Sequence, residues 1–245
     1  MPILIGVLLL IQIAFVIHVI KTGRDRTWIW LILVFSGIGC LVYFLLEVLP
    51  DLRRSRAGRQ TASKLLKAID PHHDLKARAN ALEISDNVDN RLQLAKECVA
   101  EGLYEQAVDL YSSTLTGLYA NDPHIMLQLA EALFYNGDYA KAKSTLEELI
   151  AANPDFKSSE GHLLFARTLE ALEENKAALH EYETLVSYFV GYEAKCRYAL
   201  LLKKLGHTEK AYALFSGIIT QSKRMPTQYR KTQKAWIDIA TQQIG

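Results

Sequence analysis

The residues best suited to catalysis or metal binding are few and poorly placed. His72 and His73 are adjacent, and neighbouring residues of a helix point about 100° apart, so the pair makes a poor joint metal site. The paired carboxylates Glu147–Glu148 and Glu173–Glu174 would need a pocket that shifts one pKa before they acted as acid and base. The sequence suggests no such pocket, and we interpret both pairs as exposed helix or turn charges.

The three cysteines do not form a recognisable site either. Cys40 lies in an apolar run, and Cys98 and Cys196 lie in helical patterns that favour small buried side chains. The sequence contains no C-x-x-C pair and no nucleophile-elbow, zinc-protease, Walker or dinucleotide-binding motif. It therefore predicts no enzyme active site, no metal site and no cofactor.

Composition divides the 245-residue chain into two unlike parts. The first fifty residues carry almost no charge, whereas the remainder is rich in Ala, Leu, Glu, Lys and Tyr. With few β-branched runs and few prolines, this second part is expected to be all-helical. The formal net charge of +1 lacks the basic excess of nucleic-acid-binding proteins, so no nucleic-acid partner is expected.

Two apolar stretches predict a membrane anchor over residues 1–50. They run from Pro2 to Ile20 and from Trp28 to Leu49, and each is long enough to cross a hydrocarbon core of about 30 Å as a helix. A cleavable signal peptide is the alternative for the first stretch. No basic region precedes that stretch and no clear small-x-small cleavage site follows it. We therefore expect two uncleaved transmembrane helices in the lipid bilayer.

Basic residues set the expected orientation of this anchor. The short link 21–27 places the N-terminus and the following domain on the same side of the membrane. Cytoplasmic flanks carry an excess of basic residues, and the second stretch is followed by Arg53, Arg54, Arg56, Arg59, Lys64 and Lys67. We interpret residues 51–87 as a basic juxtamembrane linker with lead-in helices, for which contact with anionic headgroups is a further role. The domain beyond it is expected in the cytoplasm.

The second apolar stretch resembles the N-terminal membrane segment of cardiolipin synthases and other phospholipase D family proteins. The resemblance rests on Trp28–Phe35, Gly37–Gly39 and Tyr43–Leu45. That family usually has a proline where this chain has Ser36, and often has one where this chain has Cys40. The resemblance implies an anchor in a bacterial inner membrane. It implies no activity, because the family's H-x-K signature with its following aspartate is absent.

Internal repeats dominate the rest of the chain. Four segments share a Leu/Phe/Tyr-Ala pair, a turn position that is usually glycine, and a second alanine. The second alanines recur about every 35 residues, at Ala107, Ala142, Ala178 and Ala211. This pattern resembles the tetratricopeptide repeat family over residues 88–221, whose period is 34 residues. Glu173 stands at the third turn in place of glycine, which puts the geometry of that turn in question.

The resemblance implies a right-handed α-solenoid of helix hairpins. Small residues are needed where the two helices of a hairpin cross, which pairs Ala95, Ala130, Ala166 and Ala199 with the second alanines. Residues 222–245 are expected to end the stack as one capping helix, whose inner residues are Trp236, Ile237, Ala240 and Ile244. The whole chain is therefore predicted to be all-α, with two transmembrane helices followed by four repeats and a capping helix.

In this family the first helix of each pair lines a concave groove, and helical spacing gives the groove-facing positions. The predicted partner-binding residues are Leu92, Lys96, Leu127, Gln128, Glu131, Tyr135, Leu163, Arg167, Glu170, Arg197, Leu200 and Lys203. This mixture suits a protein or peptide held by a few anchors. A solvated helix face without a ligand is the alternative. A chaperone-type carboxylate clamp is not expected, because leucines 92 and 164 occupy two of its basic positions.

These patterns predict a membrane-anchored scaffold or adaptor that binds a partner protein or peptide in its groove and is not an enzyme. The alternative is an accessory subunit of a membrane lipid or envelope enzyme, recruited through its transmembrane hairpin. The identity of the partner and the oligomeric state stay open.

Overall fold

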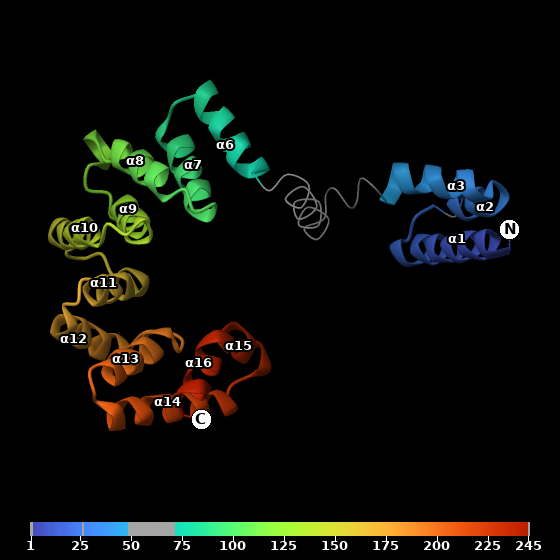
Figure 1. The fold of residues 1–245 in the computed structure, drawn as a ribbon. Coiled ribbons are helices and arrows are strands. Elements are labelled where there is room, and N and C mark those ends of the chain that lie inside the picture. Colours follow the sequence, from blue (N-terminus) through green and yellow to red (C-terminus); the bar gives the residue numbers. More distant parts are fainter. Residues whose placement is uncertain (1, 26, 49–71, 245) are drawn as a thin grey trace. The chain divides into compact units, whose positions relative to one another are not determined.

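The computed structural model describes residues 2–25, 27–48 and 72–244, without the side chains of residues 2–8 and 36. The chain forms two compact units, Met1–Asp74 and Leu75–Gly245. Every regular element in the described ranges is a helix, as Figure 1 shows, so the expected all-α class is confirmed there. The basic cluster predicted at residues 53–67 lies outside the described ranges.

The first unit contains α1 (Pro2–Thr22), α2 (Thr27–Val34), α3 (Ser36–Tyr43) and a π-helical turn (Phe44–Val48). The second apolar stretch is therefore not one straight helix. The chain bends at Phe35, whose φ of −98° and ψ of 11° lie outside the helical region. Helices α2 and α3 approach each other closely at Gly39. A Cβ added to this glycine would lie only 2.2 Å from the Leu31 carbonyl oxygen.

Within the described ranges, no helix combines the length and the apolar character that a membrane crossing requires. The prediction of two transmembrane helices is therefore not supported. In the second stretch the bend leaves two helices that are each too short to cross a membrane. Helices α2 and α3 have 8 residues each and span only about 12 Å apiece.

The N-terminal helices enclose a small apolar core that also holds polar groups, and many of their apolar side chains face outward. Gln12 is 7% exposed, and its Nε2 donates to the Ile32 carbonyl oxygen at 3.1 Å. His18 Nδ1 lies 2.9 Å from the Tyr43 hydroxyl, which is fully buried. Large apolar side chains instead face outward along the same helices, among them Leu10, Ile13, Trp30, Phe35 and Ile38.

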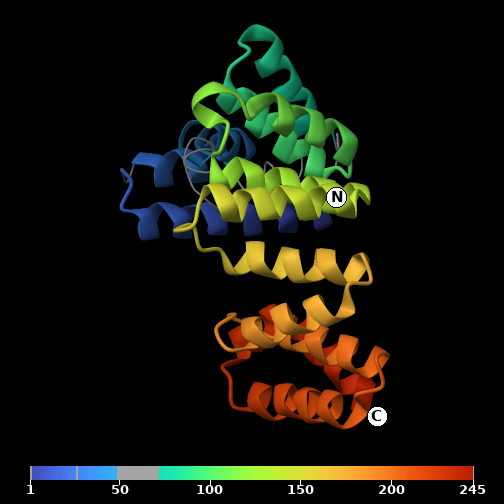
Figure 2. The same ribbon diagram turned by 90° about the vertical axis from the view of Figure 1, so that its left-hand side faces the viewer.

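The second unit begins with α6 (His73–Ile84) and continues as four helix hairpins. Their helices are α7 (Val88–Ala100) with α8 (Tyr104–Thr114), α9 (Pro123–Asn136) with α10 (Tyr139–Ala152), α11 (Ser159–Ala171) with α12 (Asn175–Val186), and α13 (Glu193–Lys204) with α14 (Thr208–Lys223). The hairpins stack in sequence order (Figure 2), and α7, α9, α11 and α13 lie on the inner side of the arc (Figure 1).

Short polar side chains start several of these helices. Asn87 caps α7 by accepting the Asn90 N–H, and Ser158 caps α11 by accepting the Gly161 N–H. The Asp122 carboxylate accepts two N–H groups at the start of α9, where Pro123 occupies the first turn. These caps fix where the first three repeats begin, because they satisfy N–H groups that have no partner within the helix.

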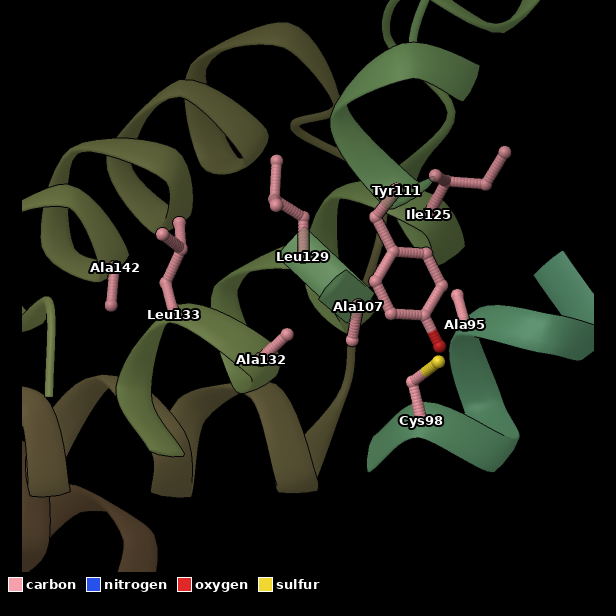
Figure 3. Close-up of a cluster of buried hydrophobic side chains, with 9 residues drawn as sticks. All are labelled: Ala95, Cys98, Ala107, Tyr111, Ile125, Leu129, Ala132, Leu133 and Ala142. Carbon is pink, nitrogen blue, oxygen red and sulfur yellow. The ribbon is translucent and has the colours of Figure 1, made fainter. Parts of the chain in front are cut away.

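Buried alanines mark each helix crossing. Ala95, Ala130, Ala166 and Ala199, together with the four second alanines, are all 0% exposed. Figure 3 shows the first crossing, where Ala95 of α7 and Ala107 of α8 lie against the ring of Tyr111. Small, fully buried side chains therefore stand at the positions that the predicted repeat spacing assigns to the helix crossings.

The turn within each hairpin uses a left-handed residue. Gly102, Gly137 and Gly206 have φ values of 75°, 87° and 87°. Glu173 adopts the same conformation with φ 60°, although a side chain disfavours it. The third turn therefore keeps the geometry of the others, and the missing glycine costs stability without changing the hairpin.

The predicted single capping helix is instead two helices, α15 (Thr227–Thr232) and α16 (Lys234–Ile244). The break falls at Gln233, whose Oε1 accepts the Tyr192 N–H at 2.9 Å. Trp236 and Ala240 pack on the fourth repeat as expected. The expectation for Ile244 was wrong, because its side chain is 42% exposed.

Replacing Ala142 by phenylalanine should destabilise the repeat unit. The alanine is fully buried at the crossing of α9 and α10, so a ring forces the helices apart at a cost of about 1–3 kcal/mol. Urea unfolding of the variant measures this loss, with the exposed Ala140→Phe as control. An unchanged free energy of unfolding in Ala142→Phe would contradict the register.

Replacing Glu173 by glycine should stabilise the third hairpin. Glycine enters the left-handed conformation without steric cost, so we expect a gain of roughly 1 kcal/mol in the free energy of unfolding. Glu183→Gly serves as control, because it places glycine inside α12 and should destabilise the protein by a similar amount. A loss of stability in Glu173→Gly would show that the Glu173 side chain holds the turn.

Candidate partner-binding site

The apolar residues predicted for the groove mostly serve packing. Leu163 is 6% exposed and belongs to the core of the third repeat, so its assignment to the groove was wrong. Leu92 and Leu200 are half-buried against the cores of the first and fourth repeats. Leu127 packs at the junction of the second and third repeats. These leucines offer little surface to a partner.

The polar and aromatic predictions remain accessible to different degrees. Lys96, Glu131 and Tyr135 are exposed on α7 and α9. The other polar members are half-buried on α9, α11 and α13, namely Gln128, Arg167, Glu170, Arg197 and Lys203. A partner-binding surface on these helices would therefore depend on charged and aromatic groups.

Arg167 is the centre of an aromatic cluster between the second and third repeats. Its guanidinium carbon lies 4.5 Å from the centroid of the Phe134 ring and 5.7 Å from that of Tyr135. Tyr135 in turn stacks on Tyr104 of the first repeat, with centroids 5.5 Å apart and planes at 21°. Such contacts orient an arginine for binding. Sequence reasoning missed Phe134 and Tyr104 as members, although Tyr104 is itself a repeat landmark.

A recess of about 350 Å³ lies beside this arginine. Sequence reasoning predicted three of the residues that line it, Arg167, Glu170 and Arg197. It missed the others, Phe134, Ala171, Glu173 and Lys204. Because its residues come from α9, α11 and α13, the recess joins three successive repeats at one point. Its three cations and two carboxylates give it a slight positive excess.

Two of the charged residues in the recess are held by neighbours. Glu170 Oε2 accepts a hydrogen bond of 2.7 Å from the Tyr182 hydroxyl. Burial, followed by the charge of Glu170, raises the pKa of Tyr182, so the hydroxyl stays a donor. Arg197 Nε donates to Glu193 at 2.8 Å, and its guanidinium lies 5.0 Å from the Trp236 ring centroid.

Arg167 differs from these two because part of its hydrogen-bonding capacity is unused. Its Nε is buried and has no hydrogen-bond partner within the described chain, and the same holds for Oε1 of Gln128. A buried polar atom without a partner costs about 1–3 kcal/mol. A carboxylate or carbonyl brought to the recess would meet the guanidinium there, because Arg167 lines the recess.

The far end of the predicted groove is partly occupied by the C-terminal helix. Lys203 Nζ donates to Gln243 Oε1 of α16 at 2.9 Å and lies 5.3 Å from the Tyr212 ring centroid. Trp236 of the same helix covers Arg197. The accessible part of the inner face is therefore centred on α9 and α11.

The cysteines of the repeat unit are not suited to nucleophilic chemistry. Cys98 and Cys196 are buried, as predicted, and burial raises the pKa of Cys196 to about 11. Such thiols stay protonated near neutral pH and are poor nucleophiles. His72 and His73 are exposed, and no cluster of His, Cys, Asp and Glu in the described ranges could hold a metal.

Comparison with known proteins agrees with this repeat geometry. Residues 99–167, which cover α8, α9, α10 and most of α11, match the family model described as tetratricopeptide repeat. Over these residues the hairpins are similar to tetratricopeptide repeats. No curated protein matches the chain. The resemblance of the N-terminal segment to phospholipase D proteins has no support, because the family match lies entirely within the repeats.

Several solved structures share the fold of the repeat unit. MamA from Desulfovibrio magneticus RS-1 (residues 41 to the end) superimposes with a TM-score of 0.58 at 15% identity, over 69% of this chain and 95% of that one. A kinesin light chain-like repeat protein of Podosopora anserina gives 0.52 at 19%, over 64% and 85%. A thermophilic tetratricopeptide repeat protein of Thermus thermophilus gives 0.50 at 18%, over 66% and 88%. At these identities the likeness concerns the fold alone.

Proposed function

We propose that the protein is a non-enzymatic scaffold that binds a partner protein on the inner face of its repeats, with Arg167 at the centre of the contact. The observation that carries this proposal is the guanidinium held on the Phe134 ring beside a recess that joins three repeats. Its Nε has no acceptor within the described chain. The partner is expected to supply a carboxylate or a backbone carbonyl.

The residues around this arginine have the character of an interface hot spot. Arginine and tyrosine are enriched at such positions, because they combine apolar area with directional hydrogen bonds. Tyr135 is 42% exposed and stacks on Tyr104, so a large ring is already fixed at the surface. The partner therefore meets an ordered surface and loses little affinity to the ordering of side chains.

We also propose that the N-terminal helices attach the scaffold to a membrane, with the repeats in the cytoplasm of a bacterium. Support comes from the outward-facing apolar side chains of the first unit, such as Leu10 at 68%, Trp30 at 73% and Ile38 at 70% exposure. Exposed apolar area of this kind favours contact with hydrocarbon over water. Attachment would raise the local concentration of any bound partner.

The inner-face proposal is tested by reversing or removing its central groups. Arg167→Glu and Tyr135→Ala in the full-length protein should reduce crosslinking to bound partners by at least about tenfold. Lys141→Glu is the matched control, because it makes the same charge change at an exposed position of α10. Partner sets that are identical in the parent and in both variants would remove the inner face from the proposal.

Membrane attachment is tested by fractionation. The full chain should sediment with membranes and resist extraction by carbonate, and a variant without residues 1–50 should not. Recovery of the full chain in the soluble fraction would contradict the proposal. Replacing these residues with an unrelated hairpin separates the two roles: if partners are then lost while the protein stays in the membrane, the protein is an accessory subunit recruited through this segment.

A further inference from the structure

A second hollow in the repeat unit, here called the seam cavity, lies between the second and third repeats and has a volume of about 690 Å³. Its walls are apolar and come from α9 to α12, with Leu127, Leu146, Leu149, Ile150, Phe156 and Phe165 as the main contributors. Apart from Leu127, none of its lining residues belongs to the predicted groove. The seam cavity is therefore a separate site.

The cavity lies where the repeats depart from their own packing pattern. Four residues after the second alanine, the other repeats have Tyr111, Tyr182 and Phe215, which are 2%, 0% and 0% exposed. These rings fill the space beneath the following repeat. The second repeat has Leu146 at this position, so α10 contributes no ring to the seam with the third repeat.

The next turn of α10 shows the effect of this missing ring. Ile150 is 56% exposed, whereas its counterparts Leu115, Val186 and Ile219 are half-buried against neighbouring helices. An apolar side chain that is half-buried in three repeats is thus exposed in the second. We therefore attribute the cavity at this seam to the sequence of the second repeat.

The interior of the cavity offers mainly apolar contacts, and its polar lining residues are Lys157, Ser158, Ser159, His162, Glu181 and Tyr188. Four buried side-chain polar atoms lack a partner within the described residues, and none of them belongs to a lining residue. Among the polar lining residues, His162 is held by two neighbours, because its Nε2 is 2.5 Å from Glu181 Oε2 and its Nδ1 is hydrogen-bonded to the Tyr188 hydroxyl. Since these groups are already paired, the walls favour hydrocarbon, and the exposed Lys157 suits a head group in contact with water.

The size of the cavity restricts its occupant further. Cavities of roughly 300–1,000 Å³ bind whole small molecules, and 690 Å³ exceeds the volume of any single side chain several times. One leucine or phenylalanine from a partner helix would therefore leave most of the space empty. A flexible hydrocarbon chain can follow walls that mix leucine, isoleucine and phenylalanine.

We propose that the seam cavity binds the acyl chain of a single-chain amphiphile, a fatty acid or a lipid chain, with its polar end at the exposed Lys157. Binding would fill the space that a tyrosine or phenylalanine fills at the other seams. The ligand would thereby connect the second and third repeats without occupying the inner face.

The test is photo-crosslinking of the full-length protein with a long-chain fatty acid that carries a diazirine. Peptides that contain residues 146–165 should be labelled. Leu146→Phe supplies the ring found in the other repeats and should lower this labelling by about tenfold. Ile150→Glu places a charge on the exposed wall, where it should not disturb folding, and should have the same effect. Ser144→Phe, on the exposed face of α10, should label like the parent.

Labelling of residues 146–165 that persists at the parental level in both variants would overturn the proposal, and so would labelling confined to residues 1–48. A thermal melt of each variant checks that it remains folded. A phospholipid with the diazirine in its acyl chain, supplied in vesicles, identifies the source of the chain. Labelling by both reagents supports the proposal with bilayer lipid as the source, and labelling by the acid alone supports it with a free fatty acid.

Discussion

Close helix crossing at buried alanines is the constraint on which the repeat unit depends. The alanines predicted for the crossings are all fully buried. Tyr111 and Tyr182, four residues further along α8 and α12, pack with residues of the following repeat. The alanines therefore determine the packing within a hairpin and, through these rings, the packing between hairpins.

The two candidate sites arise from opposite departures from this regular packing. On the inner face, Arg167 and Phe134 add a charged and aromatic contact between neighbouring repeats, and the recess forms beside it. At the seam, Leu146 takes away a ring, and the cavity forms in the space beneath the third repeat. A scaffold of near-identical hairpins thus acquires distinct surfaces through a few residues, while the crossings stay unchanged.

The repeat register could be predicted because it depends on local spacing, and the alanines carry that spacing in the sequence. Features that depend on distant residues could not. Helical spacing placed Leu163 in the groove, although packing against α12 and α13 buries it. The break at Gln233 depends on the Tyr192 N–H, which lies 41 residues earlier. The bend at Phe35 likewise divides an apolar stretch whose composition alone suggests one helix.

The position of α16 has a consequence for assembly. This helix packs on α13 and α14, where the first helix of a fifth repeat would otherwise lie. Trp236 and Gln243 extend its contacts to Arg197 and Lys203. A second molecule approaching end-on would have to displace α16 before it could extend the superhelix, so the protein is protected at this end from fibre-like growth.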